Sequence, residues 1–132
     1  MMLSFELRTR DRDAFVDITD RVREAIADSG VQQGTCLIYC PHTTAGITIN
    51  ENADPDVPRD ILAALDRCFP WQAGYRHAEG NSAAHIKAST VGASCLLVVK
   101  DGKPVLGTWQ SVFFCEFDGP RSRRFHVQVC GS

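Results

Sequence analysis

Hydrophobic and polar residues alternate over residues 3–9 and again over residues 125–130. This period of two places successive side chains on opposite faces and is typical of a half-buried β-strand. Between these segments lie shorter, more continuously apolar runs, which indicate more deeply buried strands. The sequence therefore predicts strands at residues 3–9, 36–40, 45–49, 94–99, 104–108, 111–117 and 125–130.

Other segments carry the spacing of amphipathic helices. Apolar residues from Val22 to Ile26 recur at helical spacing, Thr19 or Asp20 can cap this helix, and Gly30 offers a left-handed stop. A second helix is predicted from Pro55, because proline suits the first turn, and its apolar residues fall on one stripe. A long loop over residues 70–80 and a short helix over residues 83–88, capped by Asn81 or Ser82, complete the helical part.

The order of these elements indicates the fold class. The Asp101-Gly102 pair between two apolar runs is a strong hairpin signal, because glycine accepts a positive φ without steric cost. Strands dominate, and no regular βαβ alternation is present. We therefore expect one α+β domain over residues 1–132, with antiparallel strands in two packed sheets and two to three helices.

The composition is that of a soluble globular protein. Hydrophobic residues make up 44% and charged residues 23% of the chain, and no apolar run approaches the roughly 20 residues that a bilayer requires. Residues 1–8 lack the pattern of an export signal. We therefore expect no membrane partner, a cytoplasmic location, and cysteines that are reduced thiols.

The net charge of −2 provides no general attraction for nucleic acid, so we expect no nucleic-acid partner. The one basic cluster is Arg121-Ser122-Arg123-Arg124. Such a cluster is typical of a solvated turn before a strand, and an anion site is the alternative.

Three histidines lie where predicted elements begin or end. His42 follows a buried strand, His77 lies in the long loop, and His85 lies in the first turn of the short helix. Three imidazoles with an open coordination position are typical of a catalytic zinc site. The spacing alone matches no standard ligand pattern, so satisfied surface or core histidines are the alternative. His126, in an alternating strand, is interpreted as structural or exposed.

Acidic residues follow His42 closely. Glu51 and Asp54 are candidate catalytic residues, because a carboxylate can orient a ligating imidazole or act as a general base. Asp54 also suits the cap of the helix that begins at Pro55. Glu51 is left without an ordinary structural explanation.

Four further polar residues are candidates for binding an anionic or polar substrate, although such residues more often close turns. Lys87 would meet a phosphate group as a point charge. The sequence contains no Gly-x-Ser-x-Gly nucleophile motif and no phosphate-binding Gly-x-x-x-x-Gly-Lys loop. The four candidates are Thr43, Asn50, Lys87 and Gln110.

Three blocks of sequence, PHTTAGITINENADPDVPRDI, HAEGNSAAHIKAS and GTWQSVFFCEFDGPRSRR, resemble those of the YjbQ-like family, also called the secondary thiamine-phosphate synthase family. The resemblance extends from about Phe5 to Val129. It implies an α+β fold with two packed sheets, a homotrimer, and a divalent metal ion, zinc or a similar ion, at His42, His77 and His85. Further matching positions, which the resemblance makes candidate site residues, are Asn50, Glu51, Asp54, Lys87 and Gln110.

The activity implied by the resemblance joins a pyrimidine pyrophosphate to a thiazole phosphate, with pyrophosphate leaving. The dedicated synthase resembles a much longer (β/α)8 barrel, so thiamine-phosphate synthesis is a candidate side reaction. We therefore expect a metal-dependent enzyme that acts on small phosphorylated metabolites. The alternative is a non-catalytic trimer that binds a metal or a small ligand and serves a partner protein.

Overall fold

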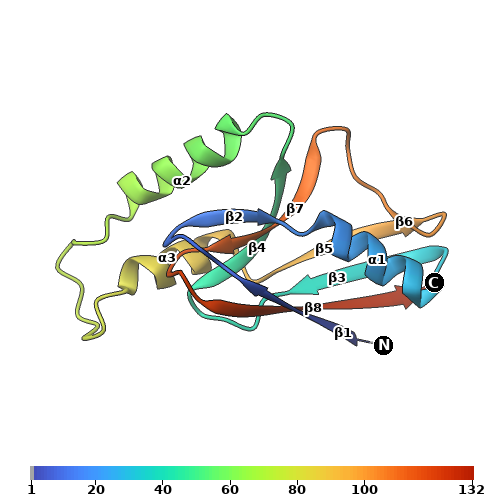
Figure 1. The fold of residues 1–132 in the computed structure, drawn as a ribbon, viewed down its shortest axis with the longest axis horizontal. Helices are drawn as coiled ribbons and strands as arrows, with labels where there is room; N and C mark the ends of the chain where they lie inside the picture. The colour runs from blue at the N-terminus through green and yellow to red at the C-terminus, as the bar shows by residue number, and fades with distance from the viewer. Residues whose placement is uncertain (1) are drawn as a thin grey trace.

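The structure is a computed structural model that describes residues 2–132. Figure 1 shows the course of the chain through its strands and helices. In chain order, the elements are β1 (Met2–Arg8), β2 (Ala14–Asp17), α1 (Thr19–Ser29), β3 (Gln33–Tyr39), β4 (Ala45–Glu51), α2 (Asp56–Cys68), α3 (Ser82–Val91), β5 (Ser94–Lys100), β6 (Lys103–Pro104), β7 (Gln110–Glu116) and β8 (Ser122–Gly131).

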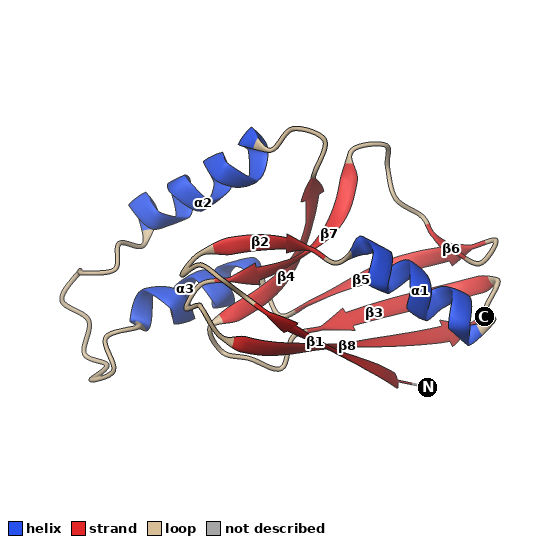
Figure 2. Ribbon diagram, viewed as in Figure 1, coloured by secondary structure: helices blue, strands red, loops and turns tan. Residues whose placement is uncertain are grey.

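The strands form two sheets. The larger sheet has five strands in the order β1-β8-β3-β5-β6, and the smaller sheet has three in the order β2-β7-β4. All the strand pairs of both sheets are antiparallel. This arrangement (Figure 2) confirms the predicted α+β fold with two antiparallel sheets and helices packed on them.

The two faces of strand β7 show how the layers pack. Val112 and Phe114 belong to the main core, which also contains residues of the large sheet and Val22 of helix α1. Phe113 and Cys115 point the other way and belong to a second core with alanines of α3. The small sheet therefore lies between the large sheet on one face and helices α2 and α3 on the other.

Helix α2 covers the small sheet less completely than its apolar stripe predicts. None of its residues is fully buried, although Leu62 and Leu65 pack against the second core. Asp66 of α2 accepts a hydrogen bond of 3.0 Å from the ammonium group of Lys87 on α3, and the same ammonium group donates to Asp13 at 3.2 Å. A buried charge therefore helps to hold α2 against α3.

One strand prediction is wrong, and one strand of the structure was not predicted. Residues 104–108 do not form a strand, because β6 ends at Pro104 and the chain leaves the sheet after a hydrogen bond of 2.8 Å from the N–H of Val105 to the carbonyl oxygen of Val98 on β5. Strand β2, at residues 14–17, was not predicted, because it has only four residues and too few alternations to reveal a period. The remaining predicted strands are present, with boundaries shifted by at most three residues.

The predicted end of α1 is confirmed, but its predicted cap is wrong. Gly30 follows the helix in the left-handed region at a φ of 72°. At the other end, neither Thr19 nor Asp20 provides the side-chain cap. The N-cap position is Ile18, whose side chain makes no capping hydrogen bond. Asp17, one residue earlier, accepts hydrogen bonds at Oδ1 from the backbone N–H and the hydroxyl group of Thr19 at 2.9 and 2.6 Å.

The six cysteines are free thiols, and three of them are buried. Burial is the main cause that raises the pKa of Cys36, to about 11. No helix within residues 2–132 has the length and apolar character needed to span a membrane.

Candidate functional site

The loop between β3 of the large sheet and β4 of the small sheet carries His42, Thr43 and Thr44. This loop, the start of α3 and the chain between β7 and β8 enclose a cavity of about 320 Å³. Because these segments are far apart in the sequence, the cavity depends on the packing of both sheets. Its lining residues are Pro41, His42, Thr43, Thr44, Glu79, Asn81, His85, Asp118, Arg121 and Arg123.

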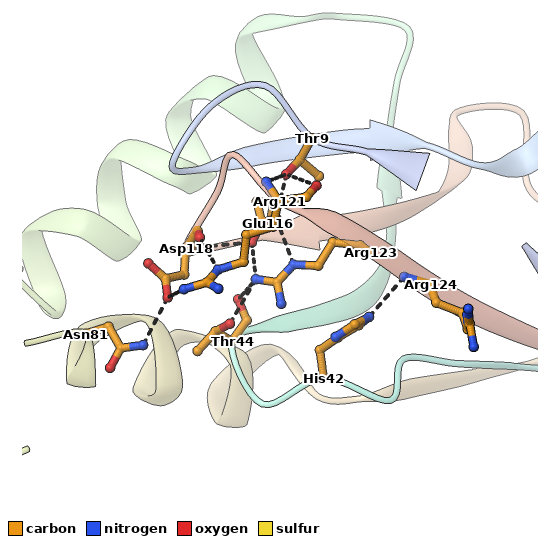
Figure 3. A network of polar contacts seen from close by, with 9 residues as sticks. All are labelled: Thr9, His42, Thr44, Asn81, Glu116, Asp118, Arg121, Arg123 and Arg124. Carbon is orange, nitrogen blue, oxygen red and sulfur yellow. Dashed lines mark hydrogen bonds and ion pairs between the residues drawn. The ribbon is translucent and has the colours of Figure 1, made fainter. Parts of the chain in front are cut away.

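His42 lies between this cavity and a wider groove of about 760 Å³, and its side chain lines both. The backbone N–H of Arg124 donates a hydrogen bond of 2.9 Å to Nε2 of His42 (Figure 3). Burial and the nearby charge of Arg123 lower the pKa of His42. The imidazole is therefore neutral near pH 7, with its proton on Nδ1.

A buried ion pair lies beside His42. Nε of Arg123 donates to Oε1 of Glu116 at 2.8 Å, and Nη2 of Arg123 donates to Oε2 of the same carboxylate. The two side chains are only 5% and 0% exposed. Thr9 donates to Glu116 at 2.6 Å, and Arg123 donates to the hydroxyl oxygen of Thr44 at 2.8 Å. The hydrogen-bonding groups of the pair are therefore satisfied by partners from separate segments of the chain, Thr9 just after β1 and Thr44 just before β4 (Figure 3).

The alternation of the strands explains why these charges are buried. Arg123 shares the inward face of β8 with Phe125, which belongs to the main core, and Glu116 shares the inward face of β7 with Phe114. Burial on its own would raise the pKa of Glu116, but the hydrogen bonds from Arg123 and Thr9 outweigh it and hold the pKa of this carboxyl below its usual range. The carboxylate is therefore charged at neutral pH.

A second polar cluster lies on the α3 side of the cavity. Oδ2 of Asp118 accepts a hydrogen bond of 2.9 Å from the amide nitrogen of Asn81 and another of 2.9 Å from Nη2 of Arg121. The amide oxygen of Asn81 is buried and has no hydrogen-bond partner within residues 2–132. Arg121, whose side chain is 52% exposed, presents further N–H donors at this side of the cavity.

His77 and His85 lie next to each other. Their ring centroids are 5.5 Å apart, and the rings are almost perpendicular at 84°. Nε2 of His77 is 3.9 Å from a carboxylate oxygen of Glu79. The fold therefore brings His77 beside His85, and it brings His85 to the same cavity as His42.

The donor chemistry of this region suits zinc, but one chain does not surround an ion. Imidazole nitrogens are good zinc ligands, and the low pKa of His42 keeps its ring in the neutral form that metals bind. Within residues 2–132, no three histidine, cysteine or acidic side chains are placed to hold one metal ion. The pair His77 and His85 could supply two imidazole ligands, and His42 lines the same cavity as His85.

Three other predicted residues lie at the opposite end of β4. Glu51 pairs with Gln110, and Asn50 pairs with Ser111, in the register of β4 with β7. The strand has seven residues, and a strand rises about 3.3 Å per residue, so this end lies roughly 20 Å from the start of β4 beside His42. In a single chain, these residues do not reach the cavity.

The side-chain contacts of Asp54 and Gln110 are those of turns and caps. Oδ1 of Asp54 accepts a hydrogen bond of 2.9 Å from the N–H of Asp56, in the first turn of α2. The side chain of Gln110 accepts one of 2.8 Å from the N–H of Gly107. The alternative interpretation, that such residues close turns, therefore describes what they do within one chain.

Lys87 also lies outside the cavity. Its side chain is 1% exposed, and its ammonium group is 3.2 Å from Asp13 and 3.0 Å from Asp66. With two carboxylates as partners, it has no free charge to present to a phosphate group. Thr43, in contrast, lines the cavity.

The sequence alone did not identify several residues of the site. The sequence indicates only a helix cap for Asn81, and for the basic cluster it favours a solvated turn, with an anion site as the alternative. The structure places Arg121 at the cavity and buries Arg123. The alternation of β8 is the signal that could have distinguished the buried arginine of this cluster from its exposed neighbour, because it turns Arg123 inward and Arg124 outward. Glu116 and Asp118 lay in an apolar strand and its turn, where nothing marked them.

Comparisons with known proteins identify similar chains. The sequence model described as "UPF0047 protein YjbQ-like" matches residues 3–132. The UPF0047 protein YugU of Bacillus subtilis is 52% identical over 132 residues, which cover 99% of this chain and 100% of YugU. A UPF0047 protein of Methanocaldococcus jannaschii is 53% identical over 131 residues, covering 99% of this chain and 95% of that protein.

Solved structures show the same fold. A YjbQ/UPF0047 family protein of Clostridium acetobutylicum, 54% identical, superposes with a TM-score of 0.96 and covers 97% of this chain and 99% of its own. A protein of Sulfolobus solfataricus, 34% identical, also gives a TM-score of 0.96, with 100% of this chain and 97% of that chain covered. The similarity therefore extends over the whole fold, including the segments that form the cavity.

Proposed function

Because this chain belongs to the UPF0047 YjbQ-like family, we propose that it is a metal-dependent enzyme acting on small phosphorylated metabolites. The observation that carries this proposal is the meeting of His42, His85 and Arg121 at one cavity. Imidazoles bind zinc, and guanidinium groups bind phosphate. The cavity therefore offers ligands for a cation next to donors for an anion.

The roles of the residues follow from their positions. His77 and His85 would hold the metal ion, zinc in the first instance, and His42 is the third candidate ligand. A bound divalent ion supplies a Lewis acid for a phosphoryl oxygen. Arg121 replaces Lys87 as the proposed phosphate-binding residue, because its side chain is 52% exposed whereas that of Lys87 is 1% exposed.

We further propose that the chain works as a homotrimer in which neighbouring copies complete the site. Glu51, Asp54, Asn50 and Gln110 lie far from the histidines of their own chain. A neighbouring copy that presents this end of β4 to the cavity would bring Glu51 to the metal site, where it could orient a ligand or take up a proton. Thr43 and Arg121 would then face the same substrate from the other side.

An exposed apolar surface on the large sheet supports self-association. Leu96 and Val98 of β5 are 65% and 61% exposed, and Leu37 of β3, directly opposite Leu96, is 40% exposed. Tyr39 and Val105 are also exposed. Neighbouring apolar side chains left in water are typical of a protein–protein interface.

The substrates in this proposal are small phosphate esters and pyrophosphates. The joining of a pyrimidine pyrophosphate to a thiazole phosphate, with pyrophosphate as the leaving group, is the specific reaction to test. It requires a site that neutralises a departing pyrophosphate. A cation and a guanidinium group would provide that charge.

The decisive experiment begins with the metal content of the purified protein, measured by elemental analysis. We expect close to one zinc or similar ion per chain, and its loss in His85→Ala and His77→Ala. His126→Ala is the matched control, because His126 lies outside the cavity. Turnover is then measured over a panel of phosphate esters and pyrophosphates, with and without chelator. Full activity in metal-free protein would remove the ion from the mechanism.

The alternative function is a non-catalytic trimer that binds a metal or a small ligand for a partner protein. The turn-closing contacts of Asp54 and Gln110 favour it, since neither side chain is free for chemistry within one chain. It predicts bound metal without turnover for any member of the panel. A molar mass measurement by light scattering tests the trimer in either case.

A further inference from the structure

A second hollow adjoins the proposed site. The groove of about 760 Å³ shares a wall with the smaller cavity, and this wall is formed by Pro41, His42 and Arg123. Figure 3 shows the two sides of this wall, with Arg121 and Asp118 on one side of Arg123 and Arg124 on the other. The groove is therefore next to the cavity but has its own lining.

Strand pairing builds the groove. In the register of β1 with β8, Arg8 lies opposite Ser122 and Glu6 lies opposite Arg124. Opposed residues share a face of the sheet, and so do alternate residues along a strand. The side chains of Arg8 and Arg124 therefore stand on the same outer face, diagonally across the strand pair. This face is polar here and becomes apolar toward Leu37 and Leu96.

The charges in the groove are only partly neutralised. Arg124 is 2.9 Å from Glu6, in a pair whose side chains are 54% and 78% exposed. Arg8 forms no ion pair within residues 2–132, and its Nη1 donates to the hydroxyl oxygen of Ser122 at 3.2 Å. An exposed ion pair is worth at most about 1 kcal/mol, so Arg124 can turn from Glu6 to a ligand at little cost.

We propose that this groove binds the phosphate group of a phosphate ester or a pyrophosphate through Arg8, Arg124 and Ser122. Two guanidinium groups and a hydroxyl group, held by neighbouring strands, match the several acceptor oxygens of a phosphate. Binding needs no metal and none of the residues on the α3 side of His42. As a further role, which rests on the proposed function, the groove would hold the second phosphorylated reactant next to the first.

Calorimetric titration of the full chain with inorganic pyrophosphate, in the presence of chelator, tests the binding site. We expect Arg8→Gln and Arg124→Gln each to weaken binding by about tenfold, because each removes a charge-assisted contact. Arg23→Gln is the matched control, since Arg23 is an exposed arginine of α1 that pairs with Asp20. Amide chemical-shift changes on pyrophosphate addition should centre on residues 122–126 and 6–8.

The outcomes separate this proposal from the proposed function. Unchanged binding in His85→Ala, with loss in Arg8→Gln, assigns the anion to the groove even if the protein carries no metal. Loss in Arg121→Gln with no effect of Arg8→Gln would place the anion in the smaller cavity and overturn the proposal. So would an absence of pyrophosphate binding by the unmodified protein at millimolar concentration. Melting temperatures identify any variant that fails to fold. If Arg124→Gln fails to fold, Arg8→Gln still tests the proposal, because the side chain of Arg8 is exposed.

Discussion

The backbone N–H of Arg124 donates its hydrogen bond to Nε2 of His42. This contact links the loop after β3 to the outer face of β8, and it fixes which nitrogen of the imidazole carries the proton. His42 therefore presents Nδ1–H as a donor, and its Nε2 lone pair becomes available to a metal ion only if the bond to Arg124 opens. Because His42 lines both the cavity and the groove, the protonation of its ring is sensitive to changes in either one.

The first prediction concerns the titration of His42. Its pKa is lowered by burial and by the charge of Arg123 from the ordinary 6.5. Between the native pKa and about 6.5, the unfolded state binds the extra proton and the native state does not, so this residue makes the free energy of unfolding fall as the pH is lowered through that window. Imidazole ¹⁵N chemical shifts should show a neutral ring with the proton on Nδ1.

His42→Asn provides the control for this linkage. The variant should lose the part of the pH dependence that belongs to this window, measured by urea unfolding at several pH values. A His42 ring that titrates above 6.5 would contradict the lowering of its pKa by burial and by the charge of Arg123. A ring that carries its proton on Nε2 would contradict the hydrogen bond from Arg124.

The second prediction is that Glu116→Gln is strongly destabilising. It leaves the buried guanidinium group of Arg123 without its counter-charge, and removing one partner of a buried ion pair costs about 3–5 kcal/mol. The native pKa of Glu116 is lowered relative to the usual 4.5. The unmodified protein therefore has the stabilisation from this carboxylate above about 4.5 and loses it as the pH falls toward the native pKa. Urea unfolding of both proteins measures both effects.

Two further variants test whether the cost arises from the unpaired charge. Glu116→Gln combined with Arg123→Met should be less destabilised than Glu116→Gln alone, because no charge is then buried without a partner. Asp20→Asn, in an exposed pair with Arg23, should change the free energy of unfolding by less than about 1 kcal/mol. Equal effects of the buried and exposed substitutions would contradict the assigned burial.

The sequence predicted the layers better than it predicted the site. Alternation at residues 3–9 and 125–130 identified two strands, and these strands pair with each other along their length. The period of hydrophobic residues could not show that Arg123 pairs with Glu116 on β7, because this ion pair is a contact between the two sheets. The three histidines were found from their positions at element ends. Their partial convergence depends on tertiary contacts. The position of Glu51 at the far end of β4, roughly 20 Å along the strand from the end beside His42, follows from the observed strand and its register.

The third prediction concerns Gly46, where α3 approaches β4. A Cβ at this position would lie 2.5 Å from the carbonyl oxygen of Gly92, which follows α3 and accepts a hydrogen bond of 3.0 Å from the N–H of Ile47. Gly46→Ala should therefore push α3 from the sheet and lower the free energy of unfolding by about 1–3 kcal/mol. Because α3 carries His85, the variant should also bind less metal if the proposed site is correct.

Gly107→Ala is the matched control for Gly46→Ala. Its Cβ would meet only the flexible side chain of Gln110, at 3.4 Å, so a change within about 0.5 kcal/mol is expected. Chemical denaturation compares the two variants directly. If Gly46→Ala were as stable as Gly107→Ala, the contact between α3 and β4 would be looser than the structure has it.

The last prediction separates a structural role of Lys87 from a substrate-binding role. Lys87→Met leaves Asp13 and Asp66 without their shared cation, although Arg12 still contacts both carboxylates. We expect a loss of about 1–3 kcal/mol in the free energy of unfolding. The hydrogen bond from Lys87 is the main cause that lowers the pKa of Asp66 from the usual 3.8, so this pKa should rise in the variant, as measured by carboxyl ¹³C titration. Lys103→Met, on the exposed edge of β6, should leave both quantities unchanged. Weakened pyrophosphate binding by Lys87→Met at unchanged stability would instead indicate that Lys87 binds the substrate, because removal of a buried ammonium group that pairs with Asp13 and Asp66 should loosen α2 from α3.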